Sequence, residues 1–97
     1  MADVGQAEVK EVQQRLEALR LSYERYFRGV DKLEPANERA RVRQQIDQLA
    51  RAPITNTQAK FQLKQLRGRF VTLQSHWNRI LAEMERGTWK RDRFIAD

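Results

Sequence analysis

The stretch LKQLRGRFVTLQSHWNRILAEM, residues 63–84, decides the fold of this chain. Its large apolar side chains recur at alternating spacings of three and four residues, which places them along one side of an α-helix. They are Leu63, Leu66, Phe70, Leu73, Trp77, Ile80 and Met84. Such a stripe predicts a long helix that packs against other helices with coiled-coil-like heptad spacing. Phe61, Val71 and Leu81 lie off the stripe, which indicates a second neighbour on another side of the helix.

The first third of the chain carries a similar stripe and predicts another long helix, over about residues 7–33. Its members again follow one another at spacings of three and four: Val9, Val12, Leu16, Leu19, Tyr23, Tyr26, Val30 and Leu33. Gly29 lowers the helix propensity by about 1 kcal/mol relative to alanine. The helix therefore either ends near Arg28 or continues to Leu33, and the pattern does not decide between these two C-terminal ends.

The segment SYERYFRG, residues 22–29, mixes aromatic and arginine side chains, as a surface that stacks bases and neutralises phosphates would. The heptad pattern favours another interpretation. Two of its aromatics, Tyr23 and Tyr26, are members of the packed stripe, and Phe27 widens that stripe. Arg25 and Arg28 fall on the outer sides of the predicted helix. We therefore interpret this segment as core and solvated surface.

A shorter helix is predicted between two proline breaks, over about residues 35–51. Glu34-Pro35 ends the preceding helix, because a residue before proline disfavours the helical conformation. One face of the segment is apolar, with Val42, Ile46 and Leu49. The outer face is expected to carry Arg39, Arg41, Arg43 and Gln44. Ala52-Pro53 ends this helix.

A capping box marks the start of the third helix, which is expected over about residues 57–86. The Thr55 hydroxyl would accept a hydrogen bond from the Gln58 backbone N–H, and the Gln58 side chain would reach back to the Thr55 N–H. Gly87 stands where a helix would end, and residues 87–97 form a tail.

These elements predict an all-α protein of one domain, residues 1–97, with three helices (long, short, long) in an antiparallel bundle. The short helix is too short to cover both long stripes. The uncovered parts either cover each other within one chain or pair between chains, so a homodimer is left open. Only four glycines and two prolines among 97 residues also agree with long helices.

The composition excludes some classes of function and indicates the kind of partner. The chain has no cysteine, which excludes disulfides and thiolate chemistry. Neither a signal peptide nor a membrane-spanning stretch is apparent, so we expect a cytoplasmic protein that does not bind membranes. The net charge is +6, and residues 58–97 hold nine basic and four acidic side chains. A basic C-terminal half favours an acidic partner.

Several short motifs resemble an uncharacterised family of small helical proteins and domains from myxobacteria and related bacteria. The family pattern is Y-E-x-Y-F-x-G, then R-F, W-x-R and G-T-[YW]-x-R-D. The matching residues here are Tyr23 to Gly29, Asn56, Phe61, Arg69-Phe70, Trp77-Asn78-Arg79 and Glu85 to Asp92. His76 stands where the family has an aromatic residue. The resemblance implies a compact helical module and carries over no catalytic or ligand residue.

An enzyme is disfavoured by the inventory of reactive groups. His76 is the single histidine, and only Glu83 among the carboxylates lies on its helical face one heptad away. One histidine and one carboxylate fall short of a zinc or iron site. No phosphate-binding glycine loop or nucleophile motif is present. We therefore expect no enzymatic activity, no metal and no cofactor.

The remaining hypothesis is a helical interaction or scaffold module that binds an acidic protein partner. Lys60, Lys64 and Arg67 follow one face of the third helix, and Arg69 flanks them. In the tail, the apolar Trp89, Phe94 and Ile95 stand among charged residues and either present a recognition segment or dock back on the bundle. Trp89, Arg91 and Arg93 are the tail residues that we expect to bind the partner. The alternative is a nucleic-acid-associated protein that contacts phosphates through the same basic residues. A face that meets only solvent also remains open.

Overall fold

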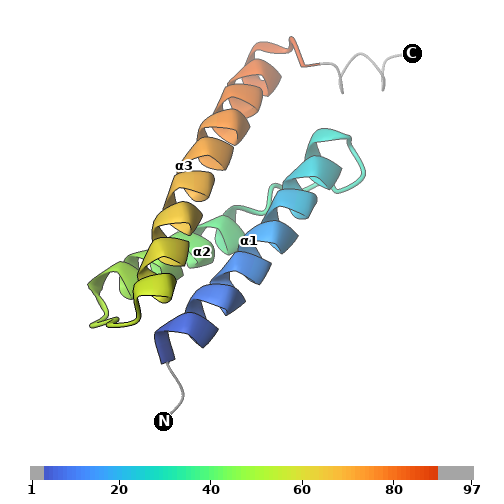
Figure 1. The fold of residues 1–97 in the computed structure, drawn as a ribbon. Helices are drawn as coiled ribbons and strands as arrows, with labels where there is room; N and C mark the ends of the chain where they lie inside the picture. The colour runs from blue at the N-terminus through green and yellow to red at the C-terminus, as the bar shows by residue number, and fades with distance from the viewer. Residues whose placement is uncertain (1–3, 90–97) are drawn as a thin grey trace.

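The computed structural model describes residues 4–89 of the chain. These residues form three α-helices: α1 (Val4–Phe27), α2 (Ala36–Arg51) and α3 (Thr57–Arg86). Figure 1 shows that α2 runs back along the bundle, so that α1 and α3 point in the same direction. The expected all-α bundle of a long, a short and a long helix is confirmed.

The two predicted heptad stripes form most of the core. The buried apolar residues are Val9, Val12, Leu16, Leu19, Tyr23 and Phe27 on α1, Val42, Ile46 and Leu49 on α2, and Ala59, Leu63, Leu66, Phe70, Trp77 and Ile80 on α3. Leu73, Leu81 and Met84 are partly buried and pack against this core. Burying a large aliphatic or aromatic side chain contributes about 1.5–3 kcal/mol, so these contacts stabilise the bundle more than any surface interaction.

The first helix ends at Phe27, and the expected extension to residue 33 is wrong. Gly29 has a φ of +85°, the left-handed conformation that glycine adopts most readily. The N–H of Val30 donates to the Arg25 carbonyl at 2.9 Å, and the N–H of Gly29 donates to the Tyr26 carbonyl at 3.1 Å. This pair of bonds is a Schellman motif, which satisfies the last carbonyls and turns the chain away. As a result Val30 and Leu33 are 67% and 84% exposed and do not belong to the core.

The third helix is capped one residue later than the sequence suggested. Asn56 is the N-cap, and its Oδ1 accepts a hydrogen bond from the Ala59 backbone N–H at 2.8 Å. The predicted capping box at Thr55 is therefore wrong, because α3 begins at Thr57 and the residue directly before it supplies the cap. At the other end Gly87 adopts a φ of +74° and closes a second Schellman motif.

Two apolar residues of α3 are largely exposed. Phe61 and Val71 are each 59% exposed, although the sequence indicated a second neighbour for them. Leu81, the third residue off the stripe, does pack against the core.

Among residues 4–89, no helix combines the length and the apolar character that a membrane crossing requires.

Candidate interaction surface

Three of the predicted partner-binding residues lie together on the surface of α3. Lys60, Lys64 and Arg67 are all exposed. None of the three side chains has an ion pair or hydrogen bond within residues 4–89. Their charges are therefore available to an external anion.

Arg69, the fourth predicted residue on α3, belongs to a different side of the helix. Its Nη2 donates to the Glu17 Oε2 at 3.0 Å, which joins α3 to α1. Glu17 also accepts hydrogen bonds from Arg20 on its own helix. These hydrogen bonds lower the pKa of the Glu17 carboxyl, and the bond from Arg20 has the largest effect. Because its charge is paired inside the protein, Arg69 is not part of the free basic surface.

Trp89 docks on the bundle. Its indole Nε1 donates to the Phe27 carbonyl at 2.9 Å, and its ring meets the Phe27 ring edge-on with centroids 6.0 Å apart. The contact covers the end of α1 with a residue from beyond the end of α3. Of the two alternatives for Trp89, docking is therefore the one observed. Arg91 and Arg93 lie outside the described residues.

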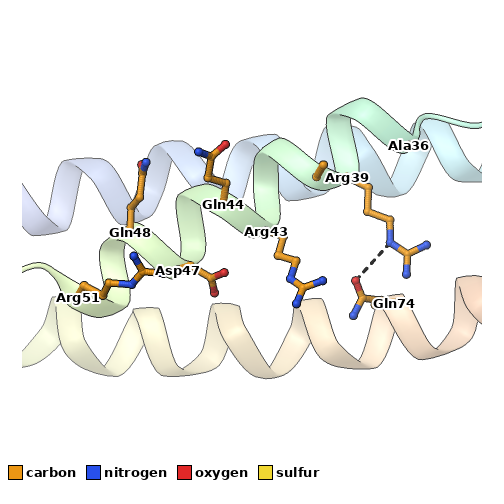
Figure 2. Close-up of a pocket in the computed structure, with 9 residues that line it drawn as sticks. Ala36, Arg39, Arg43, Gln44, Asp47, Gln48, Arg51 and Gln74 are labelled. Atoms are coloured by element: carbon orange, nitrogen blue, oxygen red, sulfur yellow. Dashed lines mark hydrogen bonds between the residues drawn. The ribbon is translucent and has the colours of Figure 1, made fainter.

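A groove of about 500 Å³ follows α2 on the side where it meets α3. Its lining residues are Ala36, Arg39, Ala40, Arg43, Gln44, Asp47, Gln48 and Arg51 from α2 and Gln74 from α3. Figure 2 shows the side chains of Arg43 and Asp47 pointing from α2 toward α3, and those of Gln44 and Gln48 pointing away. Neither Arg43 nor Arg51 has a salt-bridge partner within residues 4–89. The groove is therefore a polar cleft with a positive excess.

The free cations of α3 lie on the helical side of Gln74 and Asn78, and Gln74 is the residue of α3 that lines the groove. Arg67 and Lys60 precede Gln74 by seven and fourteen residues, and residues seven apart share one side of a helix. Lys64 is related in the same way to Asn78, which accepts a hydrogen bond from Arg39 of α2 at 2.6 Å. We call these three cations and the two unpaired arginines of the groove the basic face; its members are Arg43, Arg51, Lys60, Lys64 and Arg67. Asp47 is the one acidic residue that lines the groove, and α3 has no acidic residue before Glu83.

Arg39 was expected on the outer face of α2, and that expectation is wrong. Its side chain is only 17% exposed. The guanidinium lies over the rings of Tyr23 and Trp77, 6.0 and 5.8 Å from their centroids. It also donates to Asn78 at 2.6 Å and to Gln74 at 3.3 Å. The sequence does contain a signal for this inward position. Arg39 precedes Val42 by three residues, so it lies on the same side of α2 as the apolar stripe.

The rings beneath Arg39 connect all three helices. Tyr23 and Trp77 are stacked with centroids 4.2 Å apart and planes 13° from parallel. The Tyr23 hydroxyl donates to Glu34 Oε2 at 2.8 Å. Burial raises the pKa of Tyr23 to about 12. Since the donors of Arg39 are directed at groups of its own chain, this cluster stabilises the fold, and the basic face does not include it.

The geometry around His76 gives no catalytic arrangement. His76 is exposed, and its Nδ1 lies 3.2 Å from Nη2 of Arg79. No group of three or more histidine and carboxylate side chains in the described part of the chain is placed to hold a metal ion. Free arginine and lysine side chains of the kind found on this surface bind anions through charge-assisted hydrogen bonds.

The chain matches no protein-family model, no curated protein and no solved structure. The resemblance to the myxobacterial family therefore stays a prediction. The class that the fold and surface define is a small three-helix bundle with a basic face on α2 and α3.

Proposed function

We propose that this protein is a non-enzymatic interaction module that binds an acidic segment of another protein on its basic face. The observation that carries the proposal is a difference between the arginines of α1, which are paired with carboxylates, and the cations of the basic face. On α1, Arg15 pairs with Glu11, and Arg20 pairs with Glu17 and Glu24. The five cations of the basic face have no such partner in the described part of the chain.

Carboxylates are the natural counterpart of this face. Arginine binds carboxylates through two parallel hydrogen bonds, and lysine adds a compact positive charge. Complementary charge across an interface accelerates association and disfavours wrong partners. An acidic segment would also relieve the repulsion among the like charges of α2 and α3 in the free protein.

Among the exposed apolar side chains of α3, the aliphatic Val71 favours a protein partner over nucleic acid. Val71 lies seven residues from Lys64 and four from Arg67, so it is surrounded by the cations of α3. An aliphatic side chain offers no ring for base stacking and gains nothing from a phosphate. The core of a protein interface, by contrast, combines buried apolar contacts with a polar rim. Phe61 and Val71 can supply that apolar core.

The test is a fluorescence anisotropy titration with two labelled probes of similar negative charge. One probe is a synthetic peptide of glutamate and leucine, and the other is a short single-stranded DNA. The informative variant is Lys64→Glu/Arg67→Glu. Its matched control is Lys10→Glu/Lys32→Glu, because both residues are exposed, do not belong to α2 or α3, and change the net charge equally.

We expect the peptide to bind the unmodified protein at physiological salt and to lose at least tenfold in affinity with Lys64→Glu/Arg67→Glu. The control variant should retain most of the affinity. An equal loss in both variants would mean that net charge alone drives binding and would contradict the proposal. Binding of DNA without binding of the peptide would replace it with the nucleic-acid alternative.

A further inference from the structure

We infer that the acidic segment binds as an amphipathic α-helix packed lengthwise on the outward side of α3, with its apolar side over Phe61, Gly68 and Val71. The inference rests on the proposed function and specifies the partner's conformation and its contact line. It is carried by one juxtaposition on α3: two exposed apolar side chains, a bare glycine between them, and unpaired cations along one flank.

The contact line follows from helical spacing. Gly68 lies seven residues after Phe61 and three before Val71, so the three residues share one sector of the helix surface. Phe61 and Val71 are each 59% exposed, whereas the other large apolar residues of α3 are buried or packed against the core. Ten residues separate them, which is about 15 Å along the axis. A partner helix of about three turns covers that length.

Gly68 has no role in the fold that requires a glycine. It lies inside a helix of 30 residues, and it is not among the glycines with positive φ. A Cβ built on it would meet nothing within 4 Å. A glycine in a helix interior costs about 1 kcal/mol relative to alanine. The missing side chain does, however, leave the helix backbone uncovered at Gly68, and helix axes approach to about 8 Å where small residues meet.

The charges set the orientation of the partner around this line. By helical spacing, Lys60, Lys64 and Arg67 lie on the side of the line nearer to Gln74, which lines the groove together with Arg43 and Arg51 of α2. The partner helix therefore carries its carboxylates on one flank, next to its apolar stripe. An extended strand would not suit this surface, because every backbone group in the middle of α3 is already used within the helix and no strand edge is present in the described residues.

The experiment compares two peptides of identical glutamate and leucine composition. In the first, leucines recur at three and four residues with the glutamates on one flank, so that it forms an amphipathic helix. In the second, the order is scrambled. Affinity is measured by anisotropy, and peptide helicity on binding is measured by circular dichroism. The protein variants are Gly68→Leu and Phe61→Ala/Val71→Ala, with Gln14→Leu as the control for an exposed position on α1.

We expect the amphipathic peptide to bind at least tenfold more tightly than the scrambled one and to gain helicity when bound. Gly68→Leu should weaken binding about tenfold without destabilising the protein, because leucine is a better helix former than glycine. Phe61→Ala/Val71→Ala should weaken it similarly, and Gln14→Leu should have no effect.

The failures of the two proposals are distinguishable. If Lys64→Glu/Arg67→Glu abolishes binding while the Gly68 and Phe61 variants and the scrambled peptide bind normally, this inference is wrong and the proposed function stands. If neither peptide binds, both are wrong. If light scattering shows a dimer that Gly68→Leu converts to a monomer, a second copy of the chain occupies the face and the inference is overturned.

Discussion

The inward and the outward sides of α3 use similar residues for different purposes. The inward side is a continuous stripe in which Phe70 and Trp77 are 5% and 2% exposed. The outward side carries Phe61 and Val71, separated by Gly68 and flanked by cations. Apolar side chains specify the fold only where they form an unbroken row against another helix. Isolated ones on a charged side do not specify the packing of the helices.

The largest predicted effect removes an inward residue. Trp77→Ala deletes the ring that stacks on Tyr23 and supports Arg39, and it leaves a cavity between the helices. We expect the free energy of unfolding to fall by about 3–5 kcal/mol. Urea denaturation followed by circular dichroism measures this change. A loss below about 1 kcal/mol would show that the stacked rings are not the centre of the core.

Two arginines four residues apart on α2 should differ strongly. Arg39→Ala removes the hydrogen bonds to Asn78 and Gln74 and the contact with two rings, so we expect a loss of about 2–3 kcal/mol. Arg43→Ala removes an exposed side chain without a partner and should change stability by less than about 0.5 kcal/mol. Similar losses in the two variants, measured by the same denaturation, would contradict the assignment of Arg39 to the fold and of Arg43 to the basic face.

Two glycines of the third helix should respond in opposite directions to alanine. Gly68→Ala should raise the free energy of unfolding by about 1 kcal/mol, because the new Cβ meets nothing and alanine favours the helix. Gly87→Ala should lower it by about 1 kcal/mol, since a φ of +74° strains any side chain. Thermal unfolding of both variants checks the pair. Destabilisation by Gly68→Ala would reveal a role for this glycine within the fold itself.

The smallest effect concerns pH. The pKa of Tyr23 is raised to about 12 in the folded protein, above the ordinary value of 10.0. The stabilisation linked to this shift is therefore complete below pH 10 and is lost as the pH rises toward 12, because the unfolded chain releases the proton first. Between pH 9 and 10.5 we expect a small fall in stability that Tyr23→Phe reduces. Tyr26→Phe is the control and should keep the fall. An unchanged pH dependence in Tyr23→Phe would contradict the burial of this hydroxyl.

The sequence predicted the helices and most of the core because apolar periodicity is a local property summed over many residues. The stripe from Leu63 to Ile80 is recognisable without knowledge of its neighbours. The end of α1 was harder to place, since Gly29 could have been tolerated within a helix and only the observed backbone bonds show the Schellman motif. The place of Arg39 depends on where Tyr23 and Trp77 meet, which no single helix specifies.

The candidate surface was predictable only in part for the same reason. Lys60, Lys64 and Arg67 share a helical face that spacing alone predicts. Their position relative to Arg43 and Arg51 depends on how α2 packs against α3, and the pairing of Arg69 with Glu17 depends on the packing of α1. Charge contacts between helices depend on tertiary packing, and residue spacing along one helix does not predict them.

The most direct test of the central claim is a nuclear magnetic resonance titration of the isotope-labelled protein with the amphipathic acidic peptide. The account predicts that the largest backbone amide shifts occur in residues 60–75 of α3, with smaller shifts around Arg43 and Arg51 on α2, and that residues 4–20 of α1 do not respond. Largest shifts on α1, or no shifts at a saturating peptide concentration, would contradict the claim that this face is the binding surface.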